Sequence, residues 1–198
     1  MPPEGSPRWP FPNTLYLGLV SALLSGATFG IGGPYHEGAI FGLALAICLK
    51  ALGLKGGASF LRIVGSAMAA WFVAIAALVA VAIFTGIEPD KPIATNATAL
   101  TYLSLAIAGG LAGSVGAIFL SICTQWVCDG TAEYHAIART GLLGALAGLI
   151  MDVKAGLLLS SKELGQSPWF TFFVWQPSVL LGLVYGLRGR LFFLPRQR

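Results

Sequence analysis

The feature that most constrains this chain is a series of long apolar stretches without a charged residue or a histidine. Four of them could each form a spanning helix, at residues 9–35, 63–87, 92–128 and 164–187. A helix that crosses a bilayer needs about 20 mostly apolar residues. Only 10% of the residues are charged, against about 25% in ordinary soluble domains. The sequence therefore predicts an all-α, polytopic integral membrane bundle, with residues 1–198 forming a single transmembrane domain.

Two shorter uncharged stretches lie between the long ones, at residues 38–49 and 140–151. Stretches of this length are more often buried or re-entrant helices than complete spans. If both cross the membrane, nine basic residues lie on one side and three on the other, whereas each side carries six if neither crosses. Because Lys and Arg concentrate in cytoplasmic loops, we predict six transmembrane helices with both termini in the cytoplasm.

The two ends of the chain are predicted to be cytoplasmic segments, at residues 1–13 and 188–198. The second is a basic tail that contains Arg188, Arg190, Arg196 and Arg198. Each basic residue near an anionic leaflet contributes about 1 kcal/mol of attraction, so we expect the tail to bind anionic lipid. No other basic stretch is interleaved with aromatic residues, which argues against a nucleic-acid partner. Short loops and a compact length favour a bacterial inner membrane.

A short phrase occurs twice, as YHEGAIFGL at residues 35–43 and YHAIARTGL at residues 134–142. Each copy contains one of the two histidines, and a second similarity precedes each copy. These similarities predict two three-helix repeats, at about 15–87 and 101–187, and an odd number of spans inverts the second repeat relative to the first. Apolar sequences also resemble one another by chance, so coincidence is the alternative.

In transporters built from inverted repeats, a matched pair of short hydrophobic segments is the best sequence indication of the binding site. Here these segments are the second and fifth predicted spans. If they lie side by side, their charges form two polar layers. The outer layer contains His36, Glu37, Asp152 and Lys154, and the inner layer contains Lys50, His135 and either Glu133 or Asp129.

We expect different roles for the individual residues of these layers. Asp152 lies among apolar residues, and an acidic residue at such a depth is a candidate functional residue. Lys50 and Lys154 could instead lie at the interfaces, wetted by lipid headgroups. Gln176 adds a polar group to the sixth span, next to Pro177, where we expect a kink.

Catalytic and metal-binding patterns are weak in this chain. We find no serine or cysteine nucleophile with a base in reach, no paired carboxylates and no His-x-x-x-His, which disfavours an enzyme. The odd number of cysteines argues against a disulfide framework. Cys123, Cys128 and His135 form only a weak metal pattern, so no metal is predicted and the cofactor is unknown.

Two classes of function remain. One is a small transporter or solute-capture protein with a polar site between the second and fifth helices. The other is a non-catalytic structural or accessory subunit of a larger membrane complex. Glycines at four-residue spacing in five predicted spans indicate close helix packing, and such faces also suit a protein partner or a second copy of the chain.

Overall fold

The computed structural model describes residues 11–28, 34–52, 57–85, 99–129, 133–158 and 169–191, and these residues form six α-helices. The helices are α1 (Phe11–Ala27), α2 (Pro34–Ala51), α3 (Gly57–Thr85), α4 (Ala99–Asp129), α5 (Tyr134–Leu158) and α6 (Trp169–Leu191). The all-α prediction is confirmed. Each predicted stretch coincides with one helix, and the two short stretches belong to α2 and α5, which continue past the charges that bound them.

Two of the described helices are long and apolar enough to cross a membrane by themselves. Their apolar segments are Ser59–Val81 of α3 and Leu103–Cys128 of α4. The apolar segments of α1, α5 and α6 are shorter, at Asn13–Ala27, Tyr134–Ile150 and Phe172–Tyr185. Length and composition therefore support two membrane-spanning helices, fewer than the six that the sequence predicts.

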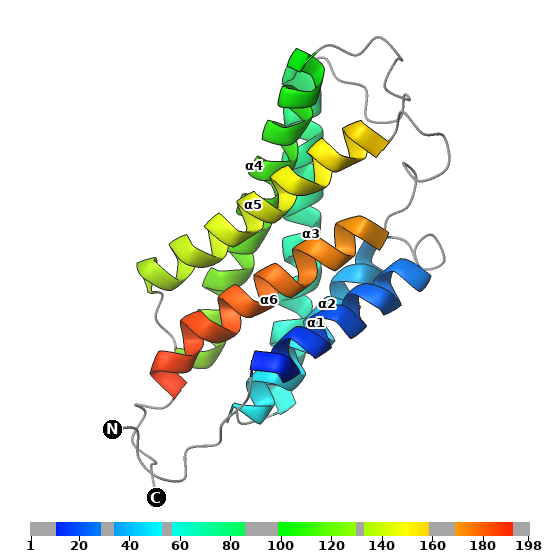
Figure 1. The fold of residues 1–198 in the computed structure, drawn as a ribbon. Helices are drawn as coiled ribbons and strands as arrows, with labels where there is room; N and C mark the ends of the chain where they lie inside the picture. Colours follow the sequence, from blue (N-terminus) through cyan, green and yellow to red (C-terminus); the bar gives the residue numbers. More distant parts are fainter. Residues whose placement is uncertain are drawn as a thin grey trace, which may run out of the picture.

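The helices form a closed ring (Figure 1). Each helix contacts its neighbours in the sequence, and α6 returns to contact α1. Helix α6 also contacts α2 and α4 across the ring. Successive helices run in opposite directions, so the start of α1, the end of α2, the start of α3 and the end of α6 all lie in the lower part of Figure 1.

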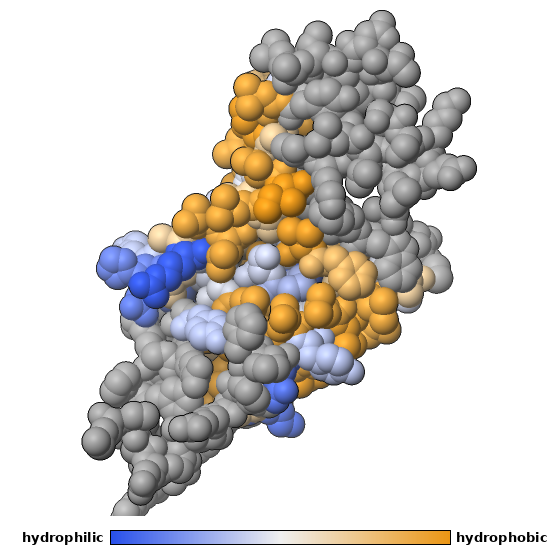
Figure 2. All heavy atoms as spheres, in the orientation of Figure 1, coloured by the Kyte–Doolittle hydropathy of each residue, from blue (hydrophilic) through white to orange (hydrophobic). Residues whose placement is uncertain are grey.

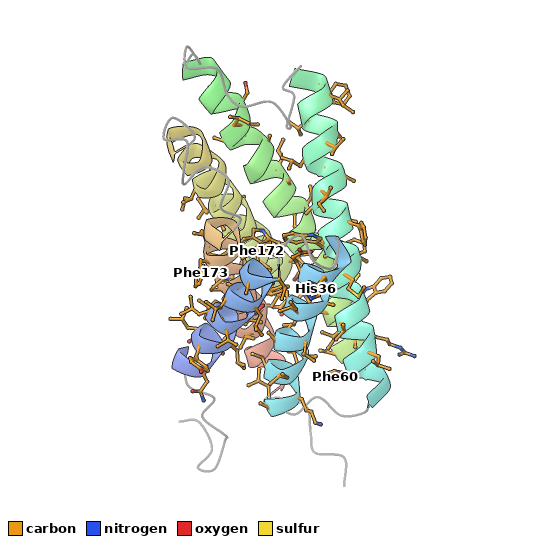
Figure 3. All side chains as sticks on the ribbon, turned by 90° about the vertical axis from the view of Figure 1, so that its right-hand side faces the viewer. His36, Phe60, Phe172 and Phe173 are labelled. Atoms are coloured by element: carbon orange, nitrogen blue, oxygen red, sulfur yellow. The ribbon has the colours of Figure 1, made fainter. Side chains whose placement is uncertain are left out.

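Helices α3 and α4 extend beyond α1, α2 and α6 at the opposite end (Figures 1 and 3). The packing of α2 on α3 shows how far α3 extends beyond the start of α2. A Cβ atom at Gly38 would lie 2.8 Å from Met68 Cα and 3.2 Å from Trp71 Cβ. Met68 and Trp71 lie in the middle of the apolar segment Ser59–Val81. Helix α2 therefore begins about half-way along the apolar length of α3.

The closest helix contact joins α4 to α5. A Cβ atom at Gly144 would overlap the carbonyl oxygen of Gly113, and a Cβ atom at Gly148 would overlap that of Gly109. Small residues at four-residue spacing allow this approach of two backbones, which is common between membrane helices. Close packing is therefore observed for the predicted glycine pairs 109/113 and 144/148, and also for the pair 38/42, which lies against α3.

The bundle is apolar both inside and outside. Its core lies largely between α2, α3 and α6 and includes Phe41, Ile63 and Trp175. On the outside, Leu61 is 71% exposed and Phe84 is 90% exposed. Figure 2 shows apolar side chains over most of the face formed by α1, α5 and α6, with the most hydrophilic atoms where α5 begins. Helices that are hydrophobic all round suit a membrane better than water.

Candidate functional site

The first turn of α2 contains a buried acidic residue. Glu37 is only 3% exposed, and its Oε2 atom has no hydrogen-bond partner among the residues that the structure describes. The neighbouring His36 is half-buried, and its Nδ1 atom is likewise buried and without a described partner. Because burying an unpaired carboxyl group costs free energy, an acidic residue at this depth is a candidate functional residue.

Aromatic side chains surround this end of α2. Phe41 follows Glu37 by one helical turn, and its ring centroid lies 5.5 Å from that of Trp175 on α6. Trp71 on α3 lies 5.9 Å from Trp175 and 5.7 Å from Phe172, measured between ring centroids. The cluster therefore joins α2, α3 and α6 at the level of Glu37.

Three helix ends meet near the middle of α3: the end of α1, the start of α2 and the start of α6. Figure 3 shows His36 on α2 and Phe172 on α6 at a similar height, about half-way up α3. Each helix end leaves backbone N–H or C=O groups without helical partners. Inside a bilayer, such groups are tolerated only where protein covers them or where they face a water-filled cavity. This meeting point therefore combines polar backbone with a buried carboxyl group.

Gln176, predicted as a site residue, connects α6 to α1. Its side chain is fully buried. Ser21 Oγ donates to Gln176 Oε1 at 2.6 Å, and Gln176 Nε2 donates to Ser25 Oγ at 2.9 Å. A Cβ atom at Gly18 would lie 2.8 Å from Pro177 Cα, so a glycine accommodates the proline where the two helices touch. Both ends of the amide are occupied, which gives Gln176 a role in holding α1 against α6.

A second polar group joins the end of α4 to the start of α5. Gln125 is 1% exposed, and its Nε2 donates to Ser121 Oγ at 3.0 Å. Its Oε1 accepts a hydrogen bond from the backbone N–H of Glu133. Thr124 is also buried, and its Oγ1 has no partner in the described ranges. Sequence reasoning missed these residues, although polar side chains at the end of a long apolar stretch were the available signal.

The remaining predicted site residues lie elsewhere. Lys50 is exposed in the last turn of α2, and His135 is exposed in the first turn of α5. Glu133 is half-buried just before α5. Asp152 and Lys154 belong to α5, but their side chains lie outside the described residues, so their roles stay predictions. The exposure of Lys50 agrees with the interfacial alternative.

Helices α2 and α5 are not neighbours in the ring. In the part of the chain that the structure describes, no contact joins them. The close approach of Gly38 to Met68 holds α2 against α3, and the glycine pairs hold α5 against α4. Consequently, the two polar layers predicted between α2 and α5 do not form by direct contact of these helices. The candidate site in the structure therefore lies at the junction of α1, α2, α3 and α6, and not between α2 and α5.

The chain matches no known family model. Comparisons with curated proteins and with solved structures also return no match. Function must therefore follow from the residues themselves.

Proposed function

We propose that this chain is a multi-pass membrane protein that captures or transports a small solute at the buried start of α2. The observation that carries the proposal is Glu37, which is 3% exposed and has an unpartnered carboxylate oxygen. It lies half-way along the apolar length of α3, where three helix ends meet. Many transporters bind their substrate near the bilayer midplane, where helices are interrupted.

We further propose that the end of the bundle where α1 begins and α6 ends faces the cytoplasm, which puts both termini of the chain on that side. Lys50 and Arg62 are exposed near the end of the bundle where α1 begins. Exposed basic residues favour the cytoplasmic side. Helices α3, α4 and α5 would cross the bilayer, and α6, which begins near half-depth, would return the chain to the cytoplasmic side. Helices α1 and α2 meet near half-depth and would form a re-entrant pair. No Lys or Arg lies between residues 9 and 49, so this arrangement keeps the same charge asymmetry as six complete spans.

A cysteine-labelling experiment separates the re-entrant pair from six complete spans. Thr28→Cys, in a chain whose three native cysteines are replaced by serine, places a single thiol just after α1. We expect a bulky, charged, membrane-impermeant maleimide added to the outer face of intact cells to leave this thiol unlabelled. Rapid labelling from the outer face would show that α1 crosses completely and would contradict the re-entrant pair.

Native mass spectrometry after gentle solubilisation tests the solute site. We expect the wild-type protein to retain a small molecule that Glu37→Gln loses, because this substitution removes the buried charge with little change in volume. Glu133→Gln is the matched control, because Glu133 is an acidic residue near the other copy of the repeated phrase. Retention of nothing by the wild type, or equal retention by Glu37→Gln, would contradict the proposal.

A subunit of a larger complex is the second candidate function, and one glycine favours it. Gly65 lies within the apolar segment of α3, and a Cβ atom there would meet nothing within 4 Å. The same exposed face includes Leu61 and Phe72. A small residue on an outward apolar face suits the close approach of another helix. This function predicts a protein partner in native mass spectra that Gly65→Leu displaces.

A further inference from the structure

We propose that the solute is a small organic cation of the alkylammonium class, bound between the Glu37 carboxylate and the exposed part of the Trp71 ring. This inference rests on the proposed solute site and adds the chemistry of its ligand.

The charge of Glu37 is the first argument. The nearest Lys or Arg on α2 is Lys50, which lies thirteen residues away, about 20 Å along a helix, and the Nδ1 atom of the neighbouring His36 has no partner among the described residues. In the described helices, no basic side chain pairs with Glu37. An isolated buried carboxylate is unfavourable. A bound cation would supply the missing positive charge, whereas an anionic solute would add to the repulsion.

The aromatic cluster is the second argument. Phe41, Phe172 and Trp175 are each less than 5% exposed, whereas Trp71 is only half-buried. The indole of Trp71 therefore has a part that its neighbours leave uncovered. Tryptophan is the best aromatic partner for a cation, and quaternary ammonium groups are often recognised by aromatic faces.

The position of Trp71 brings the two arguments together. Trp71 Cβ would lie 3.2 Å from a Cβ atom at Gly38, the residue that follows Glu37. Contacts with Phe172 and Trp175 fix the orientation of the indole, which lies at 70° to the ring of Trp175. Phe41, which lies on the same face of α2 as Glu37 one helical turn later, contacts Trp175, and Trp175 contacts Trp71. These contacts place Trp71 against the first turns of α2, which contain Glu37.

The surroundings favour an organic cation over a metal ion. Hard metal cations require several oxygen ligands, and softer ones bind clusters of His or Cys. Among the described ranges, no group of three His, Cys, Asp or Glu residues could hold a metal. The aromatic cluster begins one helical turn from Glu37, at Phe41, and aromatic rings suit the methyl or methylene groups of an alkylammonium ion.

Equilibrium binding of radiolabelled choline to the full chain in lipid nanodiscs tests the inference. Its uncharged carbon analogue, dimethylbutanol, has nearly the same shape. We expect saturable binding of choline, with dimethylbutanol and the Glu37→Gln variant each weaker by about tenfold or more, which corresponds to about 1.4 kcal/mol. Glu133→Gln is the matched control and should bind choline as the wild type does.

A second variant keeps the test valid if Glu37→Gln fails to fold. Trp71→Leu keeps an apolar side chain but removes the aromatic face, so choline affinity should fall severalfold and by a larger factor than dimethylbutanol affinity. Trp126→Leu changes an exposed tryptophan and should have no effect. Far-UV circular dichroism and gel filtration confirm that each variant is folded.

The outcomes separate this inference from the proposed function. Absence of saturable choline binding to the wild type, or equal affinity for choline and dimethylbutanol, would overturn the cation inference. The solute site would still stand if native mass spectra show a molecule that Glu37→Gln loses. If the wild type neither binds choline nor retains any molecule, both proposals fail.

Discussion

The two tyrosine–histidine phrases begin helices in contrasting surroundings. The first lies at the start of α2, which begins at Pro34, and the second at the start of α5, which begins at Tyr134. At matching positions, His36 is half-buried and Gly38 is buried, whereas His135 is exposed and Ile137 is half-buried. Glu37 and its counterpart Ala136 are both buried, at 3% and 6% exposed. Nearly the same letters thus start two helices, but they do not determine how deeply each start is buried.

One position in the phrase explains the difference. The third residue after tyrosine is Gly38 in α2 and Ile137 in α5. Gly38 lies against the backbone of α3 at Met68, in the middle of an apolar segment. Ile137 is half-buried, and its backbone N–H donates to the carbonyl oxygen of Glu133. A missing side chain lets α2 press onto α3, whereas α5 has no such contact at this position.

Exchanging these two residues should produce the largest effect. In Gly38→Ile, a β-branched side chain would overlap Met68 Cα, and we expect a loss of about 3 kcal/mol or more because a backbone cannot yield as a side chain can. Ile137→Gly should cost only about 1 kcal/mol through helix propensity, plus a small loss of apolar contact. Steric trapping in lipid bicelles measures both. Equal losses would show that α2 and α5 are packed alike.

Substitution of the one glycine that the two phrases share should give an intermediate effect. A Cβ atom at Gly42 would lie 2.8 Å from Val64 Cα, whereas at Gly141 its nearest neighbour is the flexible side chain of Ile118. We therefore expect Gly42→Ala to cost about 1–3 kcal/mol. Gly141→Ala should cost less than about 1 kcal/mol, because Ile118 can change its rotamer.

Gly65→Ala is the control for this pair. Its Cβ atom would meet nothing within 4 Å, so the higher helix propensity of alanine should stabilise the isolated chain by up to about 1 kcal/mol. The same unfolding measurement applies to all three variants. If Gly42→Ala matched this control, the close contact between α2 and α3 would be refuted.

Substitution of a histidine should have the smallest effect on stability, and the two histidines should differ clearly in their rate of chemical modification. His135 is exposed and His36 is half-buried, with Nδ1 inaccessible. We expect diethylpyrocarbonate to modify His135 faster than His36, as followed by peptide mass spectrometry. His135→Ala should change the unfolding free energy by less than about 0.5 kcal/mol. Faster modification of His36 would mean that the start of α2 is open to solvent.

The proposed repeat can be compared with the contacts between helices. A half-turn that exchanges α1 with α4, α2 with α5 and α3 with α6 maps the ring of sequential contacts onto itself. The contacts of any closed ring of six helices would map onto themselves in this way. The contacts of α6 with α2 and α4 are more specific, and their counterparts, α3 with α5 and α1 with α3, do not occur in the described residues. The two halves therefore differ where α6 crosses the ring.

Much of the fold was predictable from the sequence, because apolar stretches and helix starts are local properties. All six helices lie where uncharged stretches occur, and the glycine spacing indicated close helix packing, which the α4–α5 contact shows. Glu37 and His36 were named from their place in the repeated phrase and Gln176 from its polarity, and all three are wholly or partly buried. The partners of Gln176 could not be predicted, because Ser21 and Ser25 reach it only through a contact between distant parts of the chain.

By itself, the sequence determined that the chain is helical, that both its inner and outer surfaces are apolar, and that the repeated phrase starts two helices. Only the tertiary structure decided which helices touch. Packing is set by where backbones can approach, so Gly38 placed α2 against the middle of α3 and Gly144 placed α5 against α4. That choice buried Glu37 and left His135 exposed.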